Sequence, residues 1–214
     1  MLDKVNFKDL LIYAFLDPAG GKRTQIVKKV RARSAIVVVG ADYLQRIFVL
    51  YTWADRASTP EIIEKVFEVQ EHFQSRRFGC EANAQQSLFS DALAYVAKSK
   101  AKTLNLVPVV QDTKVTKEFR IRSVLQPVIG NGRLFLQANQ HELRTEITAF
   151  PTGMTVDIVD ALASAVALVP RITRQELDHR AEGQLEAYLR DSGMSDEQMA
   201  LTLLQLEQHD EPHH

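Results

Sequence analysis

Short apolar runs, each bounded by glycine, proline or charged residues, dominate the first part of the chain and predict β-strands. These runs cover Leu10–Leu16, Ser34–Gly40 and Arg46–Trp53, and they are rich in β-branched and aromatic residues. The first run ends at Asp17 and is cut off by a proline and a pair of glycines. Three consecutive strands of this kind predict an antiparallel meander.

Beyond residue 58 the apolar positions follow a helical period, and these helices alternate with short strands. Thr59 is the expected N-cap of a helix and Pro60 its first helical residue, with an apolar face that continues to Phe73. Phe78–Glu81 reads as a short strand that again ends in an acid. Further helices are expected over Gln85–Lys100, Lys117–Val128, His141–Phe150 and Val156–Val169, and strands over Asn105–Val110 and Arg133–Gln137. Hairpin strands followed by this alternation predict an α/β fold with a mixed β-sheet flanked by helices.

The pattern changes after Pro170, where two polar helices are expected over Arg174–Arg190 and Ser195–Gln208. We therefore divide the chain into a domain over residues 1–170 and an acidic helical appendage over residues 171–214. The net charge of −1 hides a difference between the two parts. The appendage has ten acidic and four basic residues, a balance of −6, whereas the first 170 residues carry +5. A basic body with an acidic tail is compatible with a nucleic-acid partner, which the total charge alone argues against.

Composition excludes several other classes of protein. A chain with 45% hydrophobic and 25% charged residues is an ordinary globular sequence. Its purely apolar runs are far shorter than the ~20 residues of a membrane span, and no secretory cleavage pattern follows the first of them. The single cysteine, Cys80, forbids an internal disulfide and suits a reducing compartment. We expect a protein that is neither membrane-embedded nor secreted.

Acidic residues recur in similar settings and are the main candidates for chemistry. Asp17 and Glu81 each end a strand, while Asp157 and Asp160 are three residues apart on one helical face. Ligands of α/β sheets bind at the carboxyl ends of neighbouring parallel strands. Any one such acid is more often a turn former or helix cap, but together they predict a cluster of like charge with no obvious interior cation. Mg²⁺ or Mn²⁺ would compensate such a cluster, and two such ions support phosphodiester hydrolysis.

Several motifs in a fixed order resemble the C-terminal nuclease domain of the tailed-bacteriophage terminase large subunit. They are Asp17-Pro18-Ala19, Ser34–Gly40, Glu81-Ala82-Asn83, Lys117–Ile121, Arg133-Leu134-Phe135, and Phe150-Pro151 before Asp157–Ala163. The resemblance spans roughly residues 10–169 of the chain. It implies an RNase H-like fold and a two-metal-ion endodeoxyribonuclease that cuts concatemeric viral DNA during genome packaging.

The resemblance also assigns roles to the four acids. Asp17 corresponds to the first-strand acid that bridges both metal ions, and Glu81 to the second ligand. The last family motif has a doubled Asp followed by a third Asp before Ala. Here Val156 occupies the first of those places, so Asp157 and Asp160 remain as catalytic and metal-binding candidates. Which of them is the principal ligand is left open.

Two basic groups are candidates for holding the DNA backbone. The first is the segment from Lys22 to Arg33, in which six of twelve residues are basic. The alternative is a solvated surface loop, but this segment directly follows Asp17. The second group lies on and before the helix that begins at Lys117, where the family also has a Lys and an Arg near the rim of its site. The proposed DNA-binding residues are Lys22, Arg23, Lys28, Lys29, Arg31, Arg33, Lys114, Lys117 and Arg120.

The leading hypothesis is therefore the nuclease of a packaging terminase that acts on double-stranded DNA in the host cytoplasm. The resemblance implies further partners, namely the portal, the small terminase subunit and an ATPase motor domain. The last is expected because the chain has no ATPase signature of its own. A Holliday-junction resolvase or integrase-like nuclease would use the same acids, and a non-catalytic docking module of the packaging assembly is the third possibility. The acidic tail either docks a packaging component, covers the basic surface, or only keeps the chain soluble.

Overall fold

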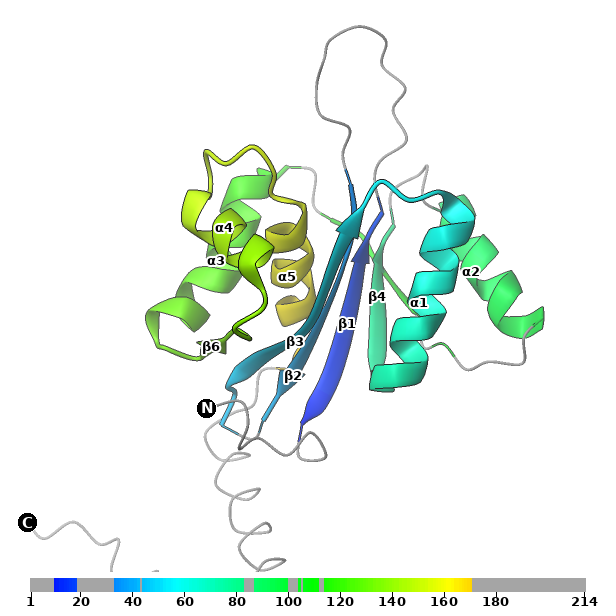
Figure 1. Ribbon diagram of the computed structural model, residues 1–214, viewed down its shortest axis with the longest axis horizontal. Coiled ribbons are helices and arrows are strands. Elements are labelled where there is room, and N and C mark those ends of the chain that lie inside the picture. Colours follow the sequence, from blue (N-terminus) through cyan, green and yellow to red (C-terminus); the bar gives the residue numbers. More distant parts are fainter. Residues whose placement is uncertain are drawn as a thin grey trace, which may run out of the picture. The chain divides into compact units, whose positions relative to one another are not determined.

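A six-stranded mixed sheet forms the centre of the fold in the computed structural model (Figure 1). The structure describes residues 10–18, 33–42, 44–82, 87–99, 104, 106–111 and 114–170. The strands are β1 (Leu11–Asp17), β2 (Ser34–Ala41), β3 (Ile47–Asp55), β4 (Arg77–Glu81), β5 (Leu106–Val109) and β6 (Leu134–Phe135), in the order β5-β4-β1-β2-β3-β6.

The meander predicted for the first three strands is confirmed. β1 pairs antiparallel with β2, so that Asp17 lies opposite Ala35, and β2 pairs antiparallel with β3, with a register shift between Val38 and Val39. β4 is parallel to β1, β5 is parallel to β4, and β6 is parallel to β3. The parallel pairing of β1 and β4 brings their carboxyl ends to the same edge of the sheet.

Helices cover both faces of the sheet, as the alternation of elements predicts (Figure 1). Alternate residues of β1 point to opposite faces: Phe15 packs in the core beneath α3–α5, and Leu16 in the core beneath α1. Every residue of β2 is buried, which accounts for its continuous apolar run. The helices are α1 (Thr59–Phe73), α2 (Ser87–Ser99), α3 (Lys117–Gly130), α4 (His141–Ala149) and α5 (Asp157–Ala167).

The start of α1 differs by one residue from the prediction. Ser58 rather than Thr59 is the N-cap, and the carboxylate of Glu61 accepts the Ser58 backbone N–H at 2.7 Å. A capping box needs a Glu or Gln three residues after the N-cap. Ser58 has Glu61 at that position, whereas Thr59 has Ile62. The two helices expected after Pro170 lie outside the described residues. In the part of the chain that is described, no helix combines the length and apolar character needed to cross a bilayer.

Candidate active site

Asp17 and Glu81 lie side by side where β1 and β4 end. Leu16 pairs with Cys80 in the parallel register, so the two acids are the next residues on adjacent strands. Their side chains share a hydrogen bond. The apolar residues that precede each acid, Leu16 and Cys80 among them, are buried in the sheet. Their burial fixes the position at which each acid follows. The predicted convergence of these two acids is found in the structure.

Asp160 completes this group from the first turn of α5. It is only 3% exposed, and its charge acts directly on Asp17. Two cations from α3 bind it: Lys117 Nζ lies 2.9 Å from Asp160 Oδ2, and Arg120 Nη2 donates to Oδ1 at 2.7 Å. The expectation of an acid cluster without an interior cation was therefore wrong, because α3 packs on α5 and brings its basic residues to the cluster.

Burial and crowding change the protonation of the site. Burial raises the pKa of Asp17 well above its usual value, and so do the charge of Asp160 and the hydrogen bond with Glu81, while Lys117 acts in the opposite direction. Burial lowers the pKa of Lys117, but Asp160 and Asp17 raise it overall, so Lys117 stays charged. A carboxyl group whose pKa is raised by burial and by neighbouring acids is common at functional sites.

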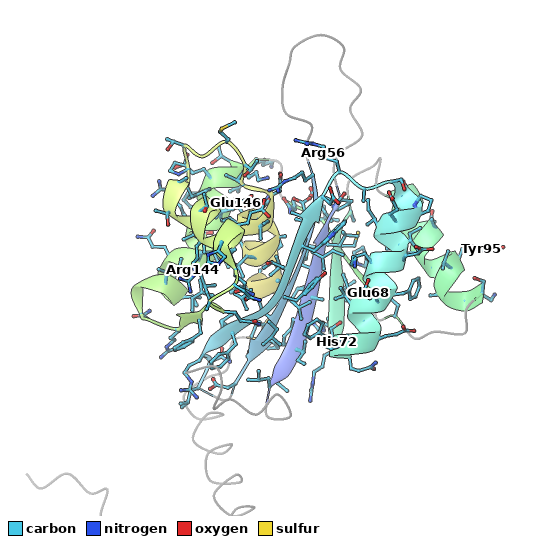
Figure 2. The ribbon with its side chains drawn as sticks, in the orientation of Figure 1. Arg56, Glu68, His72, Tyr95, Arg144 and Glu146 are labelled. Atoms are coloured by element: carbon cyan, nitrogen blue, oxygen red, sulfur yellow. The ribbon has the colours of Figure 1, made fainter. Side chains whose placement is uncertain are left out.

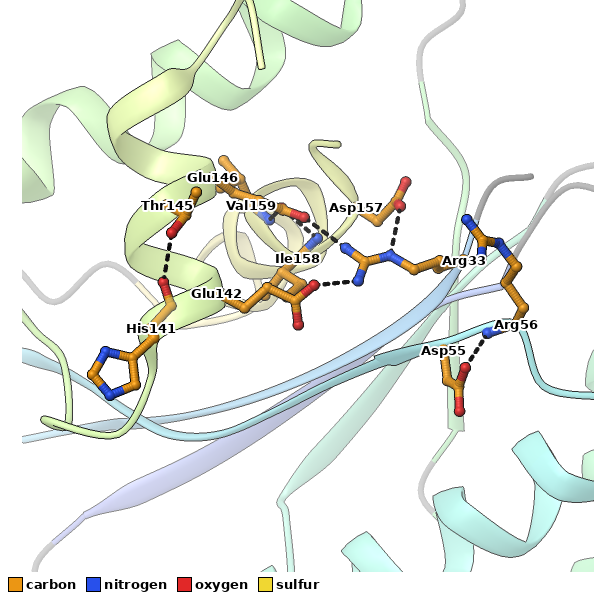
Figure 3. Close-up of polar contacts among 10 residues, drawn as sticks. All are labelled: Arg33, Asp55, Arg56, His141, Glu142, Thr145, Glu146, Asp157, Ile158 and Val159. Carbon is orange, nitrogen blue, oxygen red and sulfur yellow. Dashed lines mark hydrogen bonds and ion pairs between the residues drawn. The ribbon is translucent and has the colours of Figure 1, made fainter. Parts of the chain in front are cut away.

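Asp157 is directed toward a different group, although it lies on the same helical turn as Asp160. Its Oδ2 faces Arg33 Nε at 3.4 Å, and its side chain is 17% exposed. Arg33 also binds Glu142, and its Nη2 lies 2.9 Å from Glu146 Oε1 (Figure 3). Among the four predicted acids, the structure thus brings Asp17, Glu81 and Asp160 together and pairs Asp157 with Arg33.

The glutamates of this second cluster were missed by sequence reasoning. Glu142 and Glu146 are four residues apart on α4, so they share a face of that helix. Two like charges at this spacing are unfavourable without a cation nearby. That spacing was the available signal, but it does not identify Arg33, which lies more than a hundred residues earlier in the chain.

The candidate DNA-binding residues fall into three groups. Lys22, Arg23, Lys28, Lys29 and Arg31 lie outside the described residues. Arg33 is engaged by three carboxylates, whereas Lys114 lies in an exposed turn. Lys117 and Arg120 stand beside the acid group, and the buried Nε of Arg120 has no hydrogen-bond partner among the described residues.

The donor chemistry of the acid group fits a hard divalent cation. Asp17, Glu81 and Asp160 offer only carboxylate oxygens, which suit Mg²⁺ or Mn²⁺. In the described part of the chain, no three Asp, Glu, His or Cys side chains are arranged to hold a metal ion as they stand. Both carboxylate oxygens of Asp160 are bound by Lys117 and Arg120. A metal ion that binds Asp160 would therefore have to replace Lys117 or Arg120 at one of these oxygens.

Comparison with known proteins gives evidence on the fold. No protein-family model and no curated protein matches the sequence. The large terminase nuclease from thermophilic phage G20c matches the structure with a TM-score of 0.52 and 14% identity, over 76% of this chain and 84% of that chain. This chain has an RNase H-like fold.

Two further solved structures are similar to this RNase H-like chain at lower scores. T. thermophilus RuvC in complex with a Holliday junction substrate has a TM-score of 0.44 and 15% identity, over 72% of this chain and 90% of that chain. The P22 large terminase nuclease domain has a TM-score of 0.46 and 10% identity, over 78% of this chain and 87% of that chain. The expected α/β architecture, an antiparallel meander with added parallel strands and flanking helices, is confirmed.

Proposed function

We propose that this chain is a divalent-metal-dependent DNA endonuclease. The observation that carries the proposal is the convergence of Asp17, Glu81 and Asp160 from β1, β4 and α5, with two cations of α3 against the last of them. Carboxylates that repel one another in a partly buried site are costly to keep, and a divalent cation relieves that cost. Neighbouring cations suit a substrate that is itself a polyanion.

Each residue has a separate role in the proposed reaction. Asp17, Glu81 and Asp160 would hold the metal ions, since Asp17 and Glu81 follow paired residues of β1 and β4 and the charge of Asp160 acts on Asp17. Two bound Mg²⁺ or Mn²⁺ ions would supply activation of water and stabilisation of the leaving 3′ oxygen. Lys117 and Arg120, which both contact Asp160, would bind phosphate oxygens and position the backbone over the acids.

Within nucleases, we assign the chain to genome packaging, as the terminase large subunit nuclease. The order of the motifs from Asp17 to Ala163 supports this assignment. The partners would be double-stranded DNA, the portal, the small terminase subunit and an ATPase motor domain, in the cytoplasm of the host cell. Asp157 is proposed as an auxiliary acid rather than the principal ligand, because Arg33 binds it.

Cleavage of supercoiled plasmid with Mg²⁺ or Mn²⁺ tests the proposal. The wild-type chain should nick and linearise the plasmid, EDTA should stop the reaction, and Asp17→Asn should abolish cutting while DNA binding persists. Asp91→Asn, at an exposed position on α2, is the matched control and should cut normally. Full activity of Asp17→Asn would refute the assignment of the site.

The same assay separates the alternatives. Linear duplex and a four-way junction are offered to the wild-type chain side by side. Preference for the junction would replace the packaging assignment with a junction resolvase. No cutting of any DNA with either metal would favour the non-catalytic docking module.

A further inference from the structure

The first turn of α5 is capped by a side chain from another helix. The residue at its N-cap position is Val156, which has no polar side chain. Instead Glu146 Oε2, from α4, accepts the backbone N–H groups of Ile158 and Val159 at 2.9 and 3.0 Å. A carboxylate at this position satisfies two free donors and complements the helix dipole. The start of α5 is therefore set by a contact with α4.

Glu146 is in turn fixed by Arg33. The glutamate is 3% exposed and lies between α4 and the upper end of the sheet (Figure 2). Its second oxygen, Oε1, accepts Arg33 Nη2 at 2.9 Å (Figure 3). Arg33 directly precedes β2, and Ala35, two residues on, lies opposite Asp17. The Arg33–Glu146 pair thus joins the beginning of α5 to the strand that runs beside Asp17.

The two acids of α5 are affected differently by this arrangement. The N–H of Asp160 donates to the carbonyl of Val156 at 3.0 Å, so Asp160 belongs to the turn that Glu146 caps. Asp157, the first residue of the helix, is drawn toward Arg33. Without the pair, the first turn would lose two hydrogen bonds and Asp157 would lose its partner.

We propose that Glu146 and Arg33 are positioning residues that present Asp160 to Asp17 and Glu81 while holding Asp157 away from them. This rests on the proposed nuclease function, because it assigns Asp160 as the metal ligand from α5. Neither positioning residue would contact the metal or the DNA phosphate undergoing cleavage. Partners that orient a metal ligand commonly change metal affinity by about 10–100-fold.

Glu146→Ala in the full chain tests the proposal. We expect Mn²⁺ affinity, measured by titration, to fall by roughly tenfold or more. The value of kcat should fall with it, and KM for DNA should change little. In the metal-free protein the amides of Ile158 and Val159 should exchange with solvent faster, since they lose their acceptor. The exchange measurement needs neither metal nor DNA.

Two further variants control the experiment. Glu142→Ala is the matched control: Glu142 is on the same helix and binds the same Arg33, but it is 56% exposed and no backbone group of α5 is bonded to it in the described structure. It should keep the metal affinity and the amide protection of the wild type. Glu146→Gln keeps an acceptor for the α5 amides but loses the ion pair, so its metal affinity should lie between wild type and Glu146→Ala.

Several results would overturn the positioning role. One is a Glu146→Ala variant with wild-type Mn²⁺ affinity and amide exchange, and another is an equal loss in Glu142→Ala. If the alanine variant does not fold, Glu146→Gln decides, and wild-type metal affinity in that variant would refute the role. Failure of the proposed function would instead be seen in the wild type, as absence of Mn²⁺ binding or DNA cutting.

Discussion

Asp17 is held in a setting that costs stability in the absence of a metal ion. Burial, the charge of Asp160 and the hydrogen bond with Glu81 raise its pKa, and among the described residues the charge of Lys117 lowers it. Because the pKa is higher in the folded chain than its unfolded value near 3.8, the folded chain binds this proton more tightly. Stability therefore falls as the pH rises from the unfolded value through the raised folded value.

The raised pKa of Asp17 leads to a prediction for the stability of the metal-free protein. Asp17→Asn removes the ionised group, so at neutral pH its Tm should exceed that of the wild type by roughly 2–4 °C, the shift that about 1 kcal/mol produces in a domain of this size. The difference should shrink as the pH approaches 4, and thermal unfolding across this pH range measures it. Added Mg²⁺ should raise the Tm of the wild type but not of the variant. A less stable Asp17→Asn at neutral pH would contradict the electrostatic account.

At this scale the sequence predicts some residues of the site and not others. Asp17 and Glu81 are predictable because each follows a buried apolar run, and strand alternation is a local property. The pairing of Asp157 with Arg33, and of Asp160 with Lys117 and Arg120, is not predictable in this way. These partners are 40 or more residues apart, and only the packing of helices on the sheet brings them together.

The pairing of β1 with β4 depends on a glycine. Gly79 lies opposite Phe15 in the parallel register. A Cβ atom added at Gly79 would meet Phe15 Cδ2 at 2.6 Å and Leu168 Cδ1 at 2.8 Å. Both distances are shorter than carbon atoms tolerate, so the neighbouring side chains would have to move.

Gly79→Ala should therefore destabilise the domain by roughly 1–3 kcal/mol. Because Glu81 is only two residues further along β4, metal-dependent cutting should also fall. Denaturant unfolding and plasmid cleavage measure the two effects. Gly130→Ala is the control, since its Cβ would meet nothing within 4 Å at the end of α3, and it should be neutral or slightly stabilising. Equal stability of the two variants would contradict the close packing of β1 on β4.

At the scale of elements, the predicted strands and helices within the described residues are confirmed, with shifts at their ends. The start of α5 shows why ends are harder to predict than periods. Its cap is supplied by Glu146 from another helix rather than by a neighbouring Ser, Thr or Asp. The sequence next to this helix therefore has no capping pattern. The helix could be predicted only from the spacing of its apolar residues.

For the whole molecule, charge is divided along the chain rather than balanced within each part. The segment that begins at Lys22 is basic, and residues 171–214 are acidic. Their opposite charges largely cancel in the net charge of −1. Attraction between DNA and Lys or Arg comes from the release of counterions. The logarithm of the binding constant therefore falls linearly with the logarithm of the salt concentration. Acidic side chains reduce that attraction where they come within about 10 Å of the basic ones, the screening length at 0.1 M salt.

Two multiple variants of the full chain test this division of charge. In the first variant, the ten acids of residues 171–214 are replaced by their amides. Binding of a short duplex should tighten at low salt, and the gain should disappear near 1 M salt, where charges are screened within about 3 Å. In the second variant, Gln replaces Lys22, Arg23, Lys28, Lys29 and Arg31. Binding should weaken, and the salt slope should fall by about 0.9 for each phosphate that is no longer neutralised. Arg33 is left unchanged, because it is bound to carboxylates of α4 and α5. Unaltered DNA affinity in the tail variant would mean that the acids do not compete with DNA, and would leave docking of a packaging component or a solubilising role for the tail.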